Sequence, residues 1–204
     1  MNDLCVELGY NSINHVGEEL CGDHVETAGQ GEDSQVLVLA DGLGSGVKAN
    51  ILSILTSRII STMIAEGLPL EECVKAIAAT LPICSSRGVA YSTFTILRLI
   101  NNELAEIICY DNPPVILIRD GAPTELPGRD MIVGGKQVHR SELRLQEGDI
   151  LVAVSDGCPH AGIGVAYNFG WQLRDIADFV ATASVAGYNA KTLSTMLIAE
   201  CDRL

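Results

Sequence analysis

One stretch of the sequence decides the fold: Gln35-Val36-Leu37-Val38-Leu39-Ala40-Asp41-Gly42-Leu43-Gly44-Ser45-Gly46-Val47-Lys48-Ala49-Asn50. It opens with an apolar run, residues 36–40, that is typical of a strand buried on both faces. Asp41 follows this run, and the glycines after it allow a backbone to approach a ligand closely. Ser45 is placed to cap a helix that begins directly afterwards. The stretch therefore predicts a strand, an anchored carboxylate, and a loop able to hold a metal ion or a phosphate.

Other interpretations of the glycine-rich loop are open at this point. A strand followed by Asp-Gly is also common turn chemistry. The glycines at 42, 44 and 46 form G-x-G-x-G, which differs from the G-x-G-x-x-G of a dinucleotide loop. A Walker-type phosphate loop is excluded because Val47 separates Gly46 from Lys48.

A second stretch repeats the pattern far along the chain: Ile150-Leu151-Val152-Ala153-Val154-Ser155-Asp156-Gly157-Cys158-Pro159-His160. Again an apolar strand ends in Asp-Gly. If the two strands are neighbours in one sheet, Asp41 and Asp156 converge at its end. Paired carboxylates at such a separation share either a proton or a cation. Cys158 as a catalytic nucleophile is a weaker alternative, supported only by the neighbouring His160.

The remaining pattern alternates strands with short turns in the middle of the chain, between helices on both sides. We expect a first strand at residues 4–10 and a carboxylate, Asp23, behind a glycine. A long helix over residues 45–66 is predicted to bury a stripe at every fourth position. This stripe consists of Val47, Ile51, Leu55, Ile59 and Met63. Further helices are expected at residues 69–81, 171–183 and 189–203, and strands at 88–100, 103–110, 115–119 and 138–145.

Composition indicates one domain over residues 1–204 and excludes several classes of protein. Thirteen basic against 26 acidic residues give a formal charge of −13, which argues against nucleic-acid binding. No membrane span is predicted, because Arg58 interrupts the longest apolar stretch, residues 51–65. The N-terminus lacks the basic region of a signal peptide, and the seven cysteines are scattered without a C-x-x-C. These features favour a reducing, cytoplasmic location.

Taken in order, the motifs resemble the metal-dependent serine/threonine phosphatases of the protein phosphatase 2C superfamily. They look closest to the bacterial branch typified by the stage II sporulation protein E phosphatase domain. The residues that carry the resemblance are Cys21-Gly22-Asp23, Ala40-Asp41-Gly42-Leu43-Gly44-Ser45-Gly46, Asp111-Asn112-Pro113-Pro114, and Gly148-Asp149 leading into Ser155-Asp156-Gly157. Each motif is short, but together they span nearly the whole chain.

This resemblance implies an α+β fold, a four-layer α-β-β-α sandwich of two antiparallel sheets flanked by helices. It also implies that Asp41 bridges two divalent ions, that the Gly42 carbonyl joins one of them, and that Asp156 binds the other. Asp23 would bind or orient metal-bound water. An all-oxygen ligand set suits Mn²⁺ or Mg²⁺. The implied reaction is hydrolysis of phosphoserine or phosphothreonine by metal-activated water, and the implied partner is a phosphorylated regulatory protein.

The sequence departs from the family pattern in two places. Leu43 stands where eukaryotic relatives carry a histidine after Asp-Gly. The family's last strand, which opens with an Asp-Asp pair, is missing, so one metal position is expected to be incomplete. Its absence would leave a sheet edge on which another chain, including a second copy, could pair. A catalytically weak or inactive partner-binding module is therefore the alternative function, and a nucleotide-binding α/β module is a third.

Overall fold

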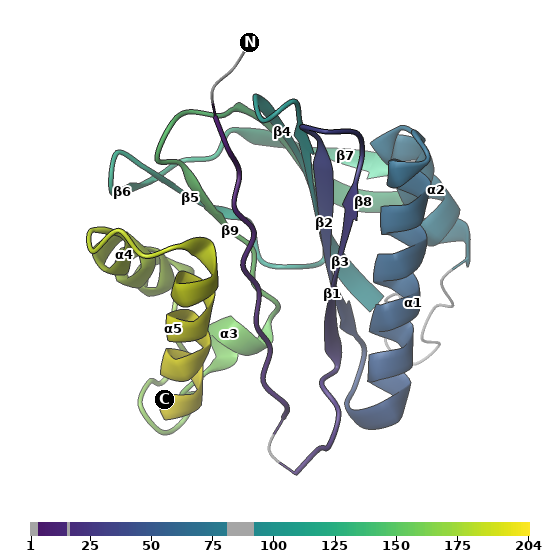
Figure 1. Ribbon diagram of the computed structural model, residues 1–204. Helices are drawn as coiled ribbons and strands as arrows, with labels where there is room; N and C mark the ends of the chain where they lie inside the picture. The colour runs from purple at the N-terminus through teal and green to yellow at the C-terminus, as the bar shows by residue number, and fades with distance from the viewer. Residues whose placement is uncertain (1–3, 16, 81–91) are drawn as a thin grey trace.

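The computed structural model describes residues 4–15, 17–80 and 92–204. Two antiparallel sheets lie face to face, and helices cover the outer face of each, which confirms the expected four-layer α+β sandwich (Figure 1). One sheet has six strands in the order β1-β2-β3-β4-β8-β7, and the other has three in the order β6-β5-β9.

In the six-stranded sheet, β2 pairs with both β1 and β3, which confirms the strand predicted before Asp41. Its strands are β1 (Asp23–Gly29), β2 (Gln35–Gly42), β3 (Ser92–Ile100), β4 (Leu104–Tyr110), β7 (Gly128–Val133) and β8 (Lys136–Arg144). Residues 36–40 of β2 are all buried, because apolar side chains cover both faces of this strand. The expected strand at residues 88–100 begins at Ser92 as far as the structure describes it, since residues 88–91 lie outside the described residues.

Helices α1 (Gly46–Ala65) and α2 (Leu70–Thr80) pack on the outer face of this sheet. The prediction of which α1 face is buried was wrong. The residues that face the sheet are mostly small or hydroxylated: Ala49, Ser53, Thr56, Ser57, Ile60, Ser61 and Ile64. The stripe from Val47 to Ile59 points to solvent instead, and only Met63 is partly buried. The predicted end of the second helix at Leu81 lies outside the described residues.

The smaller sheet consists of β5 (Ile116–Arg119), β6 (Ala122–Thr124) and β9 (Ile150–Val152). Its outer face is covered by α4 (Leu173–Ser184), and α5 (Ala190–Arg203) lies beside α4. A short helix, α3 (Gly157–His160), follows β9. β9 pairs only with β5, so its other edge is open within the described part of the chain.

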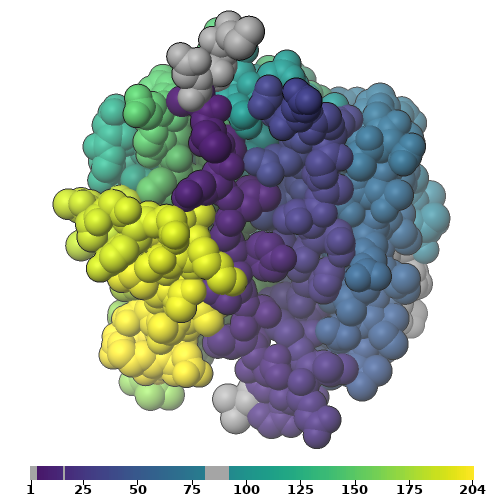
Figure 2. All heavy atoms as spheres, in the orientation of Figure 1, coloured from purple at the N-terminus to yellow at the C-terminus, as the bar shows by residue number. Residues whose placement is uncertain are grey.

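Residues 4–15 form no strand, so the strand predicted at 4–10 was wrong. The segment runs extended between the two sheets (Figure 1) and appears at the surface as a seam beside α5 (Figure 2). Side chains hold it: the Asn11 amide donates to the Thr195 hydroxyl at 2.8 Å, and Lys191 Nζ donates to the Tyr10 carbonyl at 3.2 Å. Gly9 passes so close to α5 that a Cβ atom there would lie 2.2 Å from the Ala190 carbonyl carbon. The alternating apolar pattern of this segment therefore reflects packing without strand pairing.

Candidate metal centre

Two of the predicted carboxylates lie side by side at one end of the six-stranded sheet. Asp23 opens β1 and is the direct cross-strand partner of Asp41 near the end of β2. Directly opposite residues in an antiparallel pair have Cβ atoms about 4.5–5.5 Å apart, so the two carboxylates share one local environment. Asp23 is thus half-buried beside Asp41 and is not part of an acidic surface turn.

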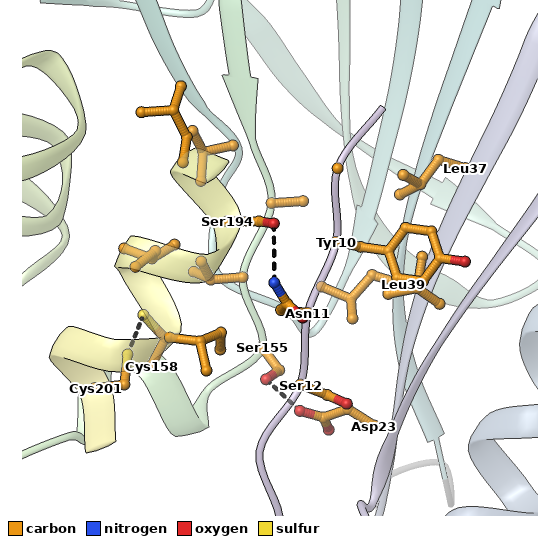
Figure 3. A pocket seen from close by; sticks show the side chains of 18 of the residues that line it. Tyr10, Asn11, Ser12, Asp23, Leu37, Leu39, Ser155, Cys158, Ser194 and Cys201 are labelled. Carbon is orange, nitrogen blue, oxygen red and sulfur yellow. Dashed lines mark hydrogen bonds between the residues drawn. The ribbon is translucent and has the colours of Figure 1, made fainter. Parts of the chain in front are cut away.

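Asp156 reaches the same place from the other sheet. The condition considered in the sequence analysis, that β2 and β9 are neighbours in one sheet, does not hold, because the two strands belong to different sheets. Asp156 instead follows β9 at the start of α3, across the sandwich from Asp41. The Ser155 hydroxyl joins the two sheets by donating to Asp23 Oδ2 at 2.6 Å (Figure 3).

Two of the three carboxylates, Asp41 and Asp23, have raised pKa values. Burial, followed by the charges of Asp23 and Asp156, raises the pKa of Asp41 to about 8. Burial also raises the pKa of Asp23, with the charge of Asp156 adding to the effect and the Ser155 hydrogen bond opposing it. A pKa so far above the ordinary value means that the cluster resists holding its full negative charge. A bound cation would relieve this repulsion.

Gly42 lets the backbone at this site approach α1. A Cβ atom on Gly42 would lie 2.0 Å from the Ala49 carbonyl oxygen, so only glycine fits there. The Gly42 amide donates to the Gly22 carbonyl at 3.1 Å, which ties the loop before Asp23 to the end of β2. Gly157, the second Asp-Gly glycine, has no such constraint, because its Cβ would meet only Ser155 Oγ at 4.0 Å.

The donor chemistry fits a hard divalent cation, since every polar ligand offered by Asp23, Asp41, Asp156 and the Gly42 backbone is oxygen. The side chains do not by themselves form a complete set of metal ligands. Among residues 4–15, 17–80 and 92–204, no three Asp, Glu, His or Cys side chains lie in the arrangement that a metal ion requires. The centre therefore offers concentrated negative charge without a closed ligand cage.

Several neighbours of the centre carry roles that the sequence did not assign. Ser45 stands at the N-cap position of α1, as predicted, but its hydroxyl makes no capping bond and donates to Glu18 Oε1 at 2.7 Å. In the Asp111–Pro114 motif, Asn112 accepts a hydrogen bond from Thr93 Oγ1 at 2.6 Å, and Thr93 is the cross-strand partner of Asp41. The role of Ser155 was indicated in the sequence only by its position, as a hydroxyl residue directly before Asp156-Gly157.

His24 and Cys158, which neighbour the centre in the sequence, have partners of their own. His24 Nδ1 lies 2.8 Å from Ser57 Oγ on α1, and burial lowers the pKa of this imidazole. Cys158 is buried, with its Sγ 3.4 Å from Cys201 Sγ on α5 (Figure 3). The hydrogen bond with Cys201, followed by burial, raises the pKa of Cys158, so this thiol is a poor nucleophile.

A large cleft leads from the carboxylates between the two sheets. Its volume is about 1860 Å³. Aliphatic side chains from the inner face of the six-stranded sheet, from β9 and from α5 line it, and residues 4–15 run along its opening (Figure 3). These lining residues include Val25, Leu37, Leu39, Leu97, Leu99, Leu151, Leu193 and Leu197. The edge of β9 that does not pair within the described residues borders this cleft.

Comparison with known proteins connects this architecture to one family. Residues 31–203 match the family model described as stage II sporulation protein E. No curated protein is similar enough in sequence to match. Among solved structures, the Bacillus subtilis stage II sporulation protein E phosphatase domain with a fragment of its regulatory domain superposes with a TM-score of 0.76 at 17% identity. The match covers 96% of this chain and 57% of that one.

Two further solved structures share the fold. The RsbU and RsbW domains of a Mycobacterium tuberculosis protein give a TM-score of 0.73 at 19% identity, covering 94% of this chain and 53% of that one. RsbX in complex with magnesium gives 0.58 at 16% identity, covering 89% and 86%. The chain thus spans little more than half the length of the first two structures. At these identities the likeness establishes the fold.

Proposed function

Because the chain belongs to the stage II sporulation protein E family, we propose that it is a protein phosphatase that hydrolyses phosphoserine or phosphothreonine on a regulatory protein. The proposal includes one catalytic domain over residues 1–204, a cytoplasmic location, and dependence on Mn²⁺ or Mg²⁺. The observation that carries it is the convergence of Asp23, Asp41 and Asp156 from β1, β2 and the end of β9, with the pKa of Asp41 raised to about 8. Such clustered, perturbed carboxylates mark functional sites more often than structural ones.

Each carboxylate has a definable part in the proposed site. Asp41 is central, because both other carboxylates raise its pKa. We propose that Asp41 and the Gly42 carbonyl hold one divalent ion, and that Asp41 and Asp156 hold a second. Asp23, fixed by Ser155, would bind or orient water beside them. When bound, such ions lower the pKa of a coordinated water and offset charge on the phosphoryl oxygens.

The names of the similar structures support the choice of substrate class. One similar structure combines RsbU and RsbW domains, and another is described as part of the bacterial stressosome. We propose by analogy that this chain acts on a phosphorylated signalling protein. His24 is engaged with Ser57, so we assign it no role in protonating the leaving group.

Phosphate release from a phosphoserine peptide, measured with Mn²⁺, with Mg²⁺ and in excess chelator, tests the proposal. We expect release only with a divalent ion, and loss of release in Asp41→Asn and Asp156→Asn. Asp130→Asn is the matched control, because Asp130 lies on β7 and pairs with His139. Full turnover in chelator, or full activity in Asp41→Asn, would remove the basis of the proposal.

A catalytically weak or inactive module that binds a signalling partner is the second candidate. It is favoured by the lack of a closed three-ligand group among the described residues. In addition, Asp23 Oδ2 already accepts the short bond from Ser155. No phosphate release from any phosphopeptide in a panel, together with measurable binding of one of the phosphoproteins, would favour this second candidate.

A further inference from the structure

Two thiols lie against each other just beyond the carboxylate centre. Cys158 belongs to α3, two residues after Asp156, and Cys201 belongs to the last turn of α5. Their Sγ atoms are 3.4 Å apart, although the two residues are separated by 43 positions in the sequence (Figure 3). Since a disulfide bond is about 2.05 Å long, the sulfur atoms need to approach each other by only about 1.4 Å to become bonded.

The other described cysteines have different surroundings. Cys21 and Cys73 donate to backbone carbonyls, Cys109 accepts from a threonine hydroxyl, and Cys5 is exposed. Cys158 and Cys201 are instead hydrogen-bond partners of each other, and both are free thiols in this structure. An oxidised sulfur at position 201 would therefore have a second thiol within reach.

An oxidant can reach this pair, and the backbone around it can adjust. Both cysteines line the cleft; Cys201 is half-buried and Cys158 is 9% exposed. A small peroxide enters wherever water does. Helix α3 has only four residues, and Cys201 lies near the end of α5, where a helix is less constrained than in its middle. A shift of the size needed for a bond is therefore compatible with the fold.

We propose that Cys158 and Cys201 form a reversible oxidation site, in which hydrogen peroxide converts the two thiols into a disulfide that joins α3 to α5 and weakens the adjoining metal centre. The disulfide stands on the thiol pair alone, whereas its effect on the metal centre rests on the proposed function. In the proposed cytoplasmic location, thiols are kept reduced, and the disulfides that do form there are usually transient.

The oxidation takes place in two steps. The sulfur of Cys201, the more exposed thiol, takes one oxygen atom from hydrogen peroxide, which gives a sulfenic acid and releases one water. The sulfur of Cys158 then displaces that oxygen, which leaves with the Cys158 proton as a second water. Two thiols thus lose two electrons in total, and one peroxide is reduced to two waters. Cys158 is a poor nucleophile, but the short distance between the two sulfurs favours their reaction.

The effect on the metal centre follows from where the thiol pair lies. Cys158 and Cys201 pack in the hydrophobic cluster that α4 and α5 form with the smaller sheet, whereas Asp23 and Asp41 belong to the six-stranded sheet. Drawing Cys158 toward α5 therefore moves the start of α3, with Asp156, away from the other two carboxylates. Metal ligands must hold their distances to within about 0.2 Å, so a small displacement weakens binding.

Peptide mapping after peroxide treatment tests the disulfide. Trypsin cleaves after Arg174 and Lys191, so the peptides that contain Cys158 and Cys201 stay together only through a disulfide. We expect joined peptides from the full chain treated with hydrogen peroxide, and their separation by dithiothreitol. Cys201→Ser and Cys158→Ser should each give none. Cys5→Ser is the matched control, because Cys5 is exposed, and it should behave like the parent.

The melting temperature gives an independent readout. A bond between residues 43 positions apart restricts the unfolded chain, so the oxidised parent should melt several degrees above the reduced parent. Cys201→Ser should show no such rise after the same treatment. Absence of the joined peptides, joined peptides that contain other cysteines, or an equal rise in Cys201→Ser would each overturn the proposed site.

Calorimetric titration with Mn²⁺ tests the effect on the metal centre. We expect the dissociation constant to be several-fold higher for the oxidised parent than for the reduced parent, and unchanged by peroxide in Cys201→Ser. An equal dissociation constant for the oxidised and reduced parent would overturn this effect. If the reduced parent binds no Mn²⁺, the proposed metal centre fails, and with it the proposed effect of oxidation, whereas the mapped disulfide stands.

Discussion

Replacing Asp41 by asparagine should stabilise the metal-free protein at neutral and alkaline pH. The pKa of Asp41 is about 8 in the folded protein against an ordinary value of 3.8, so the folded state holds the proton more tightly than the unfolded chain. Between these two pH values the folded state binds more protons, so the free energy of unfolding falls as the pH rises. The destabilisation is absent below about pH 4 and complete above about pH 8.

The size of the expected stabilisation follows from the shift in the pKa of Asp41. One pKa unit corresponds to about 1.4 kcal/mol, so the full difference sets an upper bound of about 6 kcal/mol. Solvent screens a partly exposed cluster, and the titration is shared with Asp23, so we expect about 2–3 kcal/mol. For a chain of this size, that is a rise in melting temperature of roughly 4–12 °C. Below about pH 4 the parent and Asp41→Asn should melt together.

Thermal melts in chelator across this pH range provide the measurement, with Asp130→Asn as the control that removes a carboxylate elsewhere. Added Mn²⁺ at about 1000 times the dissociation constant should invert the order, because an ion that binds only the folded parent then stabilises it by about 4.1 kcal/mol. If Asp41→Asn melts several degrees below the parent at pH 9 in chelator, Asp41 is a structural turn residue and the electrostatic reasoning fails.

Two more predictions concern the same centre. Gly42→Ala should lower the free energy of unfolding by roughly 2–4 kcal/mol, because its Cβ would collide with the Ala49 backbone. The matched variant Gly157→Ala should be nearly neutral. Equal urea midpoints for the two variants would contradict the packing argument. Calorimetric titration with Mn²⁺ should give two unequal sites, the weaker by on the order of tenfold, because one proposed position holds two carboxylates, Asp41 and Asp156, and the other holds Asp41 with only the Gly42 carbonyl. Two equally tight sites would show that another residue supplies a ligand at the weaker position.

The sequence was sufficient for the features that local chemistry controls. The run before Asp41 could be recognised as a buried strand because apolar side chains cover both of its faces. The C-terminal helix was expected at residues 189–203, and Asn189 caps it by accepting a bond from the Thr192 amide at 2.9 Å. The antiparallel middle followed from short turns such as the one at Asn101 and Asn102, both of which adopt positive φ. In each case the signal lies within a few residues of the feature.

Features that depend on distant parts of the chain were not predictable in the same way. Asp41 and Asp156 do converge, but they do so across the sandwich, from two different sheets. This could not be predicted, because an Asp-Gly at the end of a strand does not indicate which sheet the strand joins. The N-terminal segment alternates like a strand, yet residues 4–15 pair with neither sheet. Ser155, which joins the sheets, is visible in the sequence only as a hydroxyl residue beside a motif.

The error at α1 has a more specific cause. Hydrophobic periodicity identifies a helix and an apolar face, and it assumes that the apolar face is the buried one. That assumption fails where the helix must approach the sheet closely, as it does where the Ala49 backbone packs on Gly42. Small residues occupy this face near Gly42, and Ser53, Ser57 and Ser61 can be buried because each hydroxyl donates to a carbonyl of its own helix. Since close packing beside the Asp41–Gly46 loop thus favours small residues on the inner face, the larger apolar residues Val47, Ile51, Leu55 and Ile59 lie on the solvent side of α1.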